Sequence, residues 1–580
     1  MIKRFICILI FSLAILCLFT ACSKDSVHTH TFGEWRVVSN PTASEDGMKE
    51  RTCSCGETDR EVLLATGSLG LEYQIESDTT CTLVGIGSCT DEKIYIPSVY
   101  ENKMVTAIGE RVFYDCDFIK EVTIPTTVES IGSQFLYKAD SVETIFQNSG
   151  CSVSFVGDSA KTVKTIYYNG TKAKLDHNSS IVPNVIIGNN VTELDFVDRG
   201  IAFKELDIKN LSNWLNFSFS ILYSHYNDVT AENPMCCAES VKINGETVTE
   251  LVIPEGITKI GTGTFAGFKE IETLVLPSTL VEIHNSAFLN CENLSKVNIP
   301  KSLKIIDYYA FENCLFDTIE VEDIESWLSI DSYLSTDELH TNVTRYLPIS
   351  QNGLTVNGES IDRIEISDKI KKIPPAAFYG CKELANITIQ DSVVTIGYSA
   401  FQGCTSLKTV VVPDSVTTIE GYAFSECTSL SVIEIPDSVT FVGGYAFSGC
   451  TSLTSFTIPD SVSEIYAGMF KDCIRLSTVV IPDTVEDIRQ YAFQNCTSLT
   501  EFKLPNNLRT LPLNIFSGCT SLTTITLPEN LKYVNAYDFS GCTSLTTIKY
   551  PGTEEELSEV ARFNDGRVLY DYTIIYNYSE

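Results

Sequence analysis

Hydrophobic and polar residues follow a pattern with a 23-residue period over much of this chain. One repeat unit, residues 430–451, reads LSVIEIPDSVTFVGGYAFSGCT. Its first half has the spacing L-x-x-I-x-I, in which Ile433 and Ile435 alternate with Glu434 and therefore lie on one face of a β-strand. Pro436 ends the strand, because proline has no N–H group to donate to a sheet. Each unit is therefore predicted to begin with one short strand and a turn.

The second half of the unit returns the chain to the start of the next strand. Val439 and Val442 form a second short apolar stretch. Ala446 and Phe447 begin a tight or helical turn, and Cys450 ends the unit. The aromatic position recurs with the same step at Phe378, Phe401, Phe424, Phe447, Phe470, Phe493, Phe516 and Phe539. The cysteine position recurs at Cys381, Cys404, Cys427, Cys450, Cys473, Cys496, Cys519 and Cys542.

A single unit has one apolar face and cannot bury it alone. Stacked units bury these faces against one another, and a period in this range is typical of solenoids. Free cysteine packs as a small buried hydrophobe, and Phe268 fills the cysteine position of an earlier unit. The cysteine column is therefore interpreted as core. Disulfides between neighbouring turns stay an alternative, because the pairing of cysteines cannot be read from a sequence.

Two consecutive tracts carry a resemblance to a known family. VPDSVTTIEGYAFSECTSL begins at Val412 and IPDSVTFVGGYAFSGCTSL at Ile435, with the aliphatic-Pro, A-F and C-x-x-L elements at fixed offsets. They resemble the BspA-type leucine-rich repeats of bacterial surface proteins, and the similarity covers most of the chain from about residue 70. The resemblance implies a leucine-rich-repeat solenoid of short β-strands with tight or helical turns. It also implies adhesion to host matrix proteins, mucosal cells or other bacteria.

The N-terminus predicts export from the cytoplasm. Lys3 and Arg4 precede an apolar run from Phe5 to Phe19, and residues 1–21 read as a secretory signal. The tract LFTAC ends at Cys22 and resembles a bacterial lipobox, which implies a diacylated cysteine and a membrane-anchored lipoprotein on the bacterial cell surface. The alternative is an ordinary signal peptide followed by a cysteine without lipid.

Residues 22–67 are predicted to form a small strand-rich module. Within it, His28, His30, Cys53 and Cys55 are candidate zinc ligands, because zinc favours nitrogen and sulfur donors. With all four ligands supplied by the protein, the site would be structural. The alternative is a strand-rich spacer whose thiols bind no metal, and no other cofactor is required.

The rest of the chain divides into repeat blocks. The predicted segments are 68–190, a first repeat block with an atypical opening unit; 191–363, repeats with two inserts; 364–551, the regular array; and 552–580, a closing segment. The inserts LDIKNLSNWL and IEVEDIESWL match each other and contain Trp214 and Trp327. Asn-Gly pairs at 244–245 and 357–358 are separated by the same offset as the tryptophans and predict hairpin turns. The tryptophans are interpreted as small local cores, with ligand binding as the alternative.

The net charge and the absence of catalytic motifs in the sequence argue against two classes of function. The chain of 580 residues has 75 acidic and 41 basic side chains and a net charge of −34. This balance argues against nucleic acid, whose binders need clustered lysine and arginine. The six histidines are scattered, and neither H-E-x-x-H nor G-x-S-x-G occurs. An enzyme is therefore not expected.

Two rows of the repeat are candidate binding positions. The first lies between the inward strand positions and comprises Thr388, Val411, Glu434, Thr457, Val480, Lys503, Thr526 and Lys549. The second precedes the Ala-Phe pair in several units and comprises Tyr309, Tyr422, Tyr445, Tyr491 and Tyr537. Tyrosine is enriched at binding hot spots. The alternative is that these rings pack on neighbouring turns.

The leading functional hypothesis is a lipid-anchored surface protein that mediates protein or cell adhesion through its extended solenoid surface. Its partners would be host or bacterial surface proteins or glycans, together with the membrane through the anchor. One alternative is a lipoprotein that captures glycans or nutrients through the tyrosine row. Another is a structural envelope protein without a soluble ligand.

Overall fold

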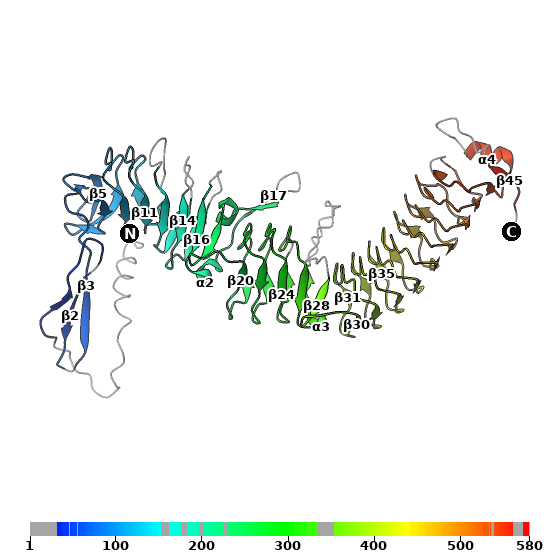
Figure 1. Cartoon of the computed structure of the whole chain (residues 1–580), viewed down its shortest axis with the longest axis horizontal. Helices are drawn as coiled ribbons and strands as arrows, with labels where there is room; N and C mark the ends of the chain where they lie inside the picture. The colour runs from blue at the N-terminus through cyan, green and yellow to red at the C-terminus, as the bar shows by residue number, and fades with distance from the viewer. Residues whose placement is uncertain are drawn as a thin grey trace.

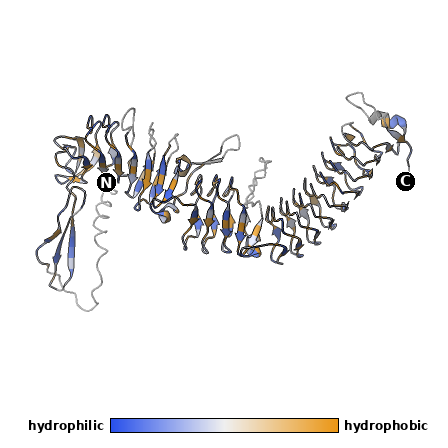
Figure 2. Cartoon of the chain, in the orientation of Figure 1, coloured by the Kyte–Doolittle hydropathy of each residue, from blue (hydrophilic) through white to orange (hydrophobic). Residues whose placement is uncertain are grey.

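The computed structural model shows a long, curved solenoid whose successive turns run from one end of the molecule to the other (Figure 1). Hydrophobic segments recur from turn to turn along it (Figure 2). The structure describes residues 32–45, 47–54, 56–151, 162–175, 183–196, 202–223, 229–307, 309–332, 353–532, 534, 539–560 and 572–578. The predicted leucine-rich-repeat solenoid with a 23-residue period is confirmed.

The regular turns up to the one that contains β40 (Thr478–Val480) and β41 (Asp487–Ile488) each contribute one strand to each of two parallel sheets. In the turn that starts at Leu430, these are β36 (Val432–Glu434) and β37 (Phe441–Val442). They pair with β34 (Thr409–Val411) and β35 (Thr418–Ile419) of the preceding turn, and every paired residue lies one repeat earlier in the chain. The second apolar stretch of the unit is therefore also a strand.

The C-terminal block holds most of the regular array. Its first sheets contain β30 (Arg363–Glu365), β32 (Asn386–Thr388), β34, β36, β38 (Ser455–Thr457), β40 (Thr478–Val480), β42 (Glu501–Lys503), β43 (Thr524–Thr526), β44 (Thr547–Lys549) and β45 (Thr573–Ile575). Its second sheets contain β31 (Lys372–Ile373), β33 (Thr395–Ile396), β35, β37, β39 (Glu464–Ile465) and β41 (Asp487–Ile488). Helix α4 (Glu554–Val560) lies between β44 and β45.

The central block has the same two-sheet plan. One sheet contains β20 (Glu250–Val252), β22 (Thr273–Val275), β24 (Lys296–Ile299), β26 (Thr318–Val321), β28 (Leu354–Val356) and β29 (Glu359–Ser360). The other contains β21 (Lys259–Ile260), β23 (Glu282–Ile283), β25 (Ile305–Ile306) and β27 (Asp331–Ser332). Helix α3 (Ile324–Leu328) follows β26.

The N-terminal block begins with an antiparallel opening unit. Its first sheet contains β4 (Glu72–Ile75), β5 (Thr80–Gly85), β7 (Val99–Tyr100), β8 (Lys103–Ile108) and β10 (Ser130–Ile131). The long parallel sheet contains β6 (Lys93–Tyr95), β9 (Glu121–Ile124), β11 (Thr144–Gln147), β12 (Thr165–Tyr168), β14 (Asn184–Ile187), β16 (Glu205–Ile208) and β19 (Val241–Ile243).

Shorter elements complete the fold. They are the pairs β13 (Lys172–Leu175) with β15 (Glu193–Phe196) and β17 (Ile221–Tyr223) with β18 (Val229–Ala231), helix α2 (Leu211–Trp214) and the 3-10 helix η1 (Pro234–Cys237). Ahead of the solenoid, β1 (Arg36–Ser39), β2 (Gly47–Thr52) and β3 (Thr58–Leu63) form a separate antiparallel sheet. The small N-terminal module is therefore rich in strands, as the sequence predicts.

The corners of the regular turns are tight turns and not helices. Tyr445 (φ 58°) and Gly449 (φ 73°), which bracket the Ala-Phe pair, both have left-handed backbone conformations. The equivalent residues of the preceding turn, Tyr422 (φ 56°) and Glu426 (φ 60°), behave in the same way. A right-handed helix excludes such residues, so the helical alternative for this turn is wrong.

A hairpin turn and a buried tryptophan occur at each of the two boundaries between the three blocks. Asn244–Gly245 and Asn357–Gly358 all have positive φ, and an antiparallel pair of residues flanks each turn. The predicted hairpins are therefore confirmed. Trp214 and Trp327 are buried, and each indole N–H donates to a carbonyl of the next block, at Thr264 (2.9 Å) and Ala377 (2.8 Å). The tryptophans thus pack in the core and join one block to the next.

Candidate binding surface

The outward side chains of five consecutive strands of the first sheets, β32 to β40, form the strand face. Inward residues such as Ile433 are buried, while the residues on either side of them point into solvent. The strand face comprises Asn386, Thr388, Thr409, Val411, Val432, Glu434, Ser455, Thr457, Thr478 and Val480, all of them exposed. Period-two alternation in a strand produces this division.

The outward row inferred from the sequence lies largely on this face. Lys503 is also exposed, whereas Thr526 and Lys549 are half-buried. The Lys549 ammonium lies 4.9 Å from the ring centroid of Tyr578, close to the C-terminal end of the solenoid. The row therefore becomes less accessible toward its last two members.

The strand face is almost uncharged, although the chain carries a net charge of −34. Glu434 is the one charged residue among its ten positions. Three of its valines are strongly exposed, with Val411 at 74%, Val432 at 52% and Val480 at 53% of their full accessible surface.

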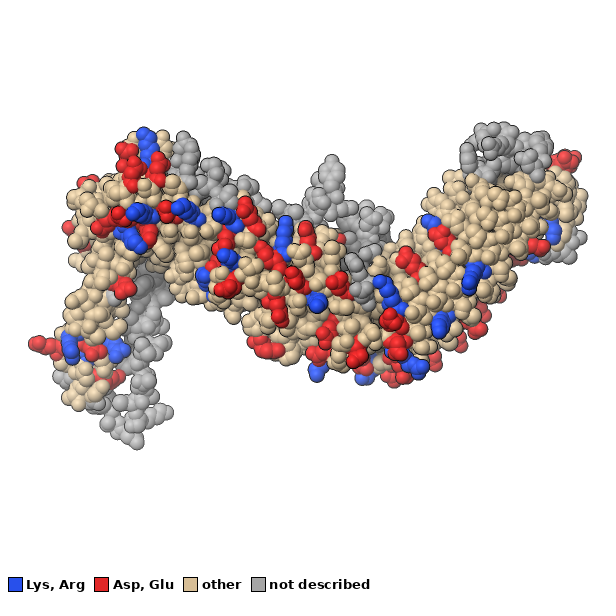
Figure 3. Space-filling model, viewed as in Figure 1, with Lys and Arg blue, Asp and Glu red and all other residues tan. Residues whose placement is uncertain are grey.

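The surface of the N-terminal block, unlike the strand face, carries many charged side chains. Its sheet carries rungs of paired charges, such as Lys93 with Glu121 (2.8 Å) and Lys164 with Glu143 (2.8 Å). Lys120 donates to Glu92 and thereby lowers the pKa of that carboxyl. Figure 3 shows red and blue side chains crowded over the N-terminal and central parts, and a mostly uncharged surface over the C-terminal units.

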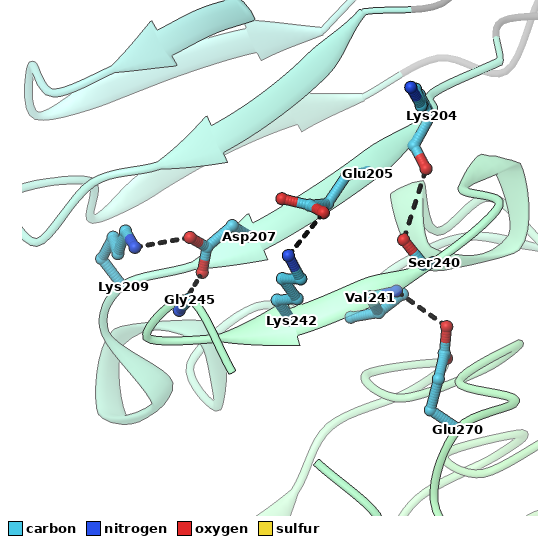
Figure 4. Close-up of polar contacts among 9 residues, drawn as sticks. All are labelled: Lys204, Glu205, Asp207, Lys209, Ser240, Val241, Lys242, Gly245 and Glu270. Atoms are coloured by element: carbon cyan, nitrogen blue, oxygen red, sulfur yellow. Dashed lines mark hydrogen bonds and ion pairs between the residues drawn. The ribbon is translucent and has the colours of Figure 1, made fainter. Parts of the chain in front are cut away.

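The last rungs of this charge ladder lie at the end of the N-terminal block (Figure 4). Glu205 pairs with Lys242 at 2.7 Å across two strands. The carboxylate of Asp207, which is buried, pairs with Lys209 and accepts the N–H of Gly245 at 2.9 Å. These charges satisfy one another and hold the hairpin turn, so they offer few free groups to a partner.

The tyrosine row packs along the solenoid axis. The rings of Tyr422 and Tyr445 are stacked at 4.9 Å with an interplanar angle of 8°, and burial raises the pKa of Tyr422. A side chain at Gly468 would overlap the ring of Tyr445. Tyr309 and Tyr491 are half-buried, and Tyr537 lies outside the described residues. The ring faces of Tyr422 and Tyr445 are thus largely covered by neighbouring turns.

Sequence reasoning missed three aromatic residues beside this row, Tyr398, Phe441 and Tyr466. Tyr398 lies 5.4 Å from Tyr422, and Phe441 lies 5.1 Å from Tyr466, measured between ring centroids. The available signal was the position of Phe441, since the preceding units have threonine there. These residues occupy single turns, so a search for repeated positions passes over them.

The cysteine column lies in the core. Each thiol from Cys404 to Cys542 donates to the carbonyl oxygen of the phenylalanine 26 residues earlier, at 3.1–3.2 Å. Burial raises the pKa of Cys381 and of Cys473 to about 12. These thiols are protonated and free, so the interpretation as core residues is confirmed.

The proposed zinc and lipid sites fall mainly outside the described residues. Cys22, His28, His30 and Cys55 lie outside them, whereas Cys53 is buried in the small N-terminal sheet. Within the described ranges, no three histidine, cysteine or acidic side chains are grouped to hold a metal ion. The zinc site therefore stays a prediction.

Among the residues that the structure describes, no helix has both the length and the apolar character needed to cross a bilayer.

The fold and its repeated surface define a leucine-rich-repeat solenoid. The family model described as the BspA type leucine rich repeat region, with six copies, matches residues 82–162, 243–334, 355–477 and 463–566. These ranges cover more than half of the chain, and the protein therefore belongs to the BspA-type leucine-rich-repeat family. No enzyme family was found. No curated protein matches the chain.

Several solved structures resemble this one. A leucine-rich repeat protein from Bacteroides ovatus is 20% identical over 87% of this chain and 98% of its own, with a TM-score of 0.30. A leucine rich cell surface protein from Faecalibacterium prausnitzii is 19% identical over 87% and 99%, with a TM-score of 0.22. The pneumococcal vaccine antigen PcpA is 15% identical over 88% and 98%, with a TM-score of 0.26.

Proposed function

We propose that this protein is a lipid-anchored surface adhesin that binds proteins of host matrix or of other cells through its strand face. The observation that supports this function most directly is the almost uncharged strip from Asn386 to Val480 on a molecule of net charge −34. Exposed strips of this kind mark interaction sites more often than ordinary surface. Membership of a family of bacterial surface repeat proteins supports the same role.

The shape of the strand face fits a macromolecule. Five strands at the usual spacing of about 4.8 Å present two outward side chains each, which makes a strip longer than it is wide. Threonine and serine hydroxyls and valine side chains both lie on it, so hydrogen bonds and apolar contacts are both available. Protein interfaces have this mixture, with charged residues depleted at their centre.

The experiment uses the chain from residue 23 onward and a panel of matrix proteins, mucins and epithelial cells. Val411→Glu and Val480→Glu together place two charges on the strand face. Charges without partners in an apolar contact cost several kcal/mol, so binding to any partner of this face is expected to fall at least tenfold. Val252→Glu is the matched control, because Val252 is 53% exposed on a strand of the central block.

Binding that survives the double substitution would contradict the assignment to the strand face. A loss caused equally by the Val252 control would move the contact to the whole solenoid. If the wild-type chain binds no member of the panel, the result would favour a structural role in the cell envelope.

The lipid anchor is tested separately. Cys22→Ser removes the sulfur to which a lipid would be attached in the expected lipobox. The substituted protein is expected to leave the membrane fraction, because two acyl chains are needed for stable anchoring. Retention of the variant in membranes would contradict a lipid anchor at this position.

A further inference from the structure

A second surface stands out on the other sheet of the same array. Tyr398, Tyr422, Phe441, Tyr445 and Tyr466 form an aromatic patch on the turns that contain β33, β35, β37 and β39. It lies apart from the strand face, because each turn contributes to two different sheets. The proposed adhesive function does not use it.

The patch is continuous across four turns. Tyr398, Tyr422 and Tyr445 follow one another with ring centroids 5.4 and 4.9 Å apart. Phe441 and Tyr466 are 5.1 Å apart in the adjoining columns. Two glycines lie between the tyrosine row and the Phe441–Tyr466 pair. The ring of Tyr445 lies over Gly468, and a Cβ atom placed at Gly444 would lie 3.9 Å from Cβ of Tyr466.

Phe441 is the most accessible ring of the patch, with 38% of its surface exposed. The corresponding residues of the two preceding turns are Thr395 and Thr418, so the solenoid does not need an aromatic side chain here. An exposed aromatic residue that the core does not require is a candidate contact residue.

The charged side chains in the turns that contain the patch indicate the kind of partner it would bind. Residues 390–470, which contain the whole patch, include eight acidic side chains and one basic side chain, Lys408. Arg489, from outside this range, also lies beside Tyr466, where it pairs with Glu464. At the rim, Glu420 pairs with Lys372 at 3.1 Å and accepts the N–H of Tyr398 at 2.8 Å. An acidic surface attracts cationic groups over about a Debye length. Arginine in particular also stacks on aromatic rings, because its guanidinium is planar and weakly hydrated.

We propose that the aromatic patch is a docking site for an arginine-rich segment of a partner protein. The acidic side chains of residues 390–470 draw the segment to the surface, and one guanidinium group stacks against the exposed ring of Phe441, beside the half-buried tyrosines. The ring contact uses no residue of the strand face, so either site can fail in experiment without the other.

The test compares two peptides of equal charge, deca-arginine and deca-lysine, for binding to the chain from residue 23 onward. The substitutions Phe441→Thr and Tyr445→Asn are combined in one variant. Both new residues already occur at the equivalent positions of other turns, Thr418 and Asn514, and Asn514 has the same left-handed backbone (φ 62°). The variant therefore removes two rings while it keeps the net charge and the local conformation.

Wild-type protein is expected to bind deca-arginine more tightly than deca-lysine. The variant should lower this ratio by about 2- to 5-fold, as expected for one solvent-exposed cation–π contact. Tyr491→Asn is the control, because Tyr491 has the same backbone (φ 63°) in a turn beyond the patch. It should leave the ratio unchanged.

An unchanged ratio in the double variant would overturn the proposal and reduce the binding to charge alone. Equal effects of the double variant and of Tyr491→Asn would also overturn it. Thermal melts of all three proteins show that any loss does not come from unfolding. Val411→Glu with Val480→Glu should leave the ratio as it is in the wild type.

Discussion

At the scale of single residues, stacked phenylalanines and buried thiols hold the array together. From Phe378 to Phe539, consecutive rings lie 5.3–6.2 Å apart and nearly parallel. Phe447 is fully buried and also packs against Phe456 at 5.0 Å. Each ring therefore supports its own turn and both neighbours.

Phe447→Ala is expected to lower the free energy of unfolding of the array by about 3–5 kcal/mol, the range for emptying a buried phenylalanine site. Urea unfolding followed by circular dichroism measures the change. Phe441→Thr in the same turn is the control and should cost much less, because its side chain is partly exposed. A midpoint unaffected by Phe447→Ala would contradict the assigned register.

The buried thiols predict a loss of stability at alkaline pH. Burial raises the pKa of Cys473 to about 12 from an ordinary value of 9.0. A raised pKa means that the folded state keeps the proton longer than the unfolded state. The stabilisation is therefore complete below about pH 9 and declines as the pH rises toward 12. Urea midpoints should accordingly fall as the pH rises above about 9.

The variant that combines Cys450→Ala and Cys473→Ala separates this effect from the titration of lysines. Its midpoint should fall less steeply over the same pH range than that of the wild type. Identical slopes for the two proteins would show that the thiols do not contribute.

At the scale of elements, the short helices α2 and α3 act as joints between blocks. Asp323 caps α3 by accepting the N–H of Ser326 at 2.7 Å, which places Trp327 on the inner side of the chain. The indole of Trp327 then reaches Ala377, 50 residues further along. Asn210 and Trp214 repeat the arrangement one block earlier. The blocks are thus joined by core contacts as well as by the chain.

Trp327→Phe keeps an aromatic ring but removes the hydrogen bond to Ala377. An unpaired buried carbonyl costs about 1–3 kcal/mol, so the joint should open before the blocks unfold. Limited proteolysis is expected to cleave the variant between the central and C-terminal blocks faster than the wild type. Trp35→Phe, in the separate N-terminal sheet, is the control. Equal cleavage rates in all three proteins would contradict the joint.

At the scale of the whole molecule, like charges line up along the solenoid. Exposed aspartates occupy the same place after the first strand in five consecutive turns, at Asp391, Asp414, Asp437, Asp460 and Asp483. Neighbouring turns are about one strand spacing apart, about 4.8 Å. Carboxylates at such a distance repel one another, and salt screens the repulsion.

Asp437→Asn removes the middle charge of this column and should raise the melting temperature at low ionic strength. The gain should shrink when NaCl is raised from about 20 mM to about 500 mM, where the Debye length becomes only a few ångströms. Thermal melts at the two salt concentrations measure the difference. Glu57→Gln, in the turn before β3 of the small N-terminal sheet, is a control at the same change of charge. A gain that is independent of salt would contradict repulsion as its cause.

Counting along the chain is enough to predict which residues share the core. In a stack of turns with a constant period, residues one period apart become neighbours, so the phenylalanine column, the cysteine column and the outward row follow from counting. The strand and its proline stop follow from local chemistry. The two tryptophan inserts were visible as a duplication, because the tryptophans and the Asn-Gly pairs share one offset.

Contacts that do not follow this period depend on how the chain folds in three dimensions. The left-handed corner at Tyr445 depends on how the backbone must turn to stack, which hydrophobic spacing does not encode. The indole of Trp327 contacts Ala377 in the next block, and Phe441 meets Tyr466 in the following turn. Neither separation equals the repeat period, because the contacts join different columns of neighbouring turns or cross from one block to the next. A periodic pattern predicts neighbours within a column, and only the folded chain determines which columns touch.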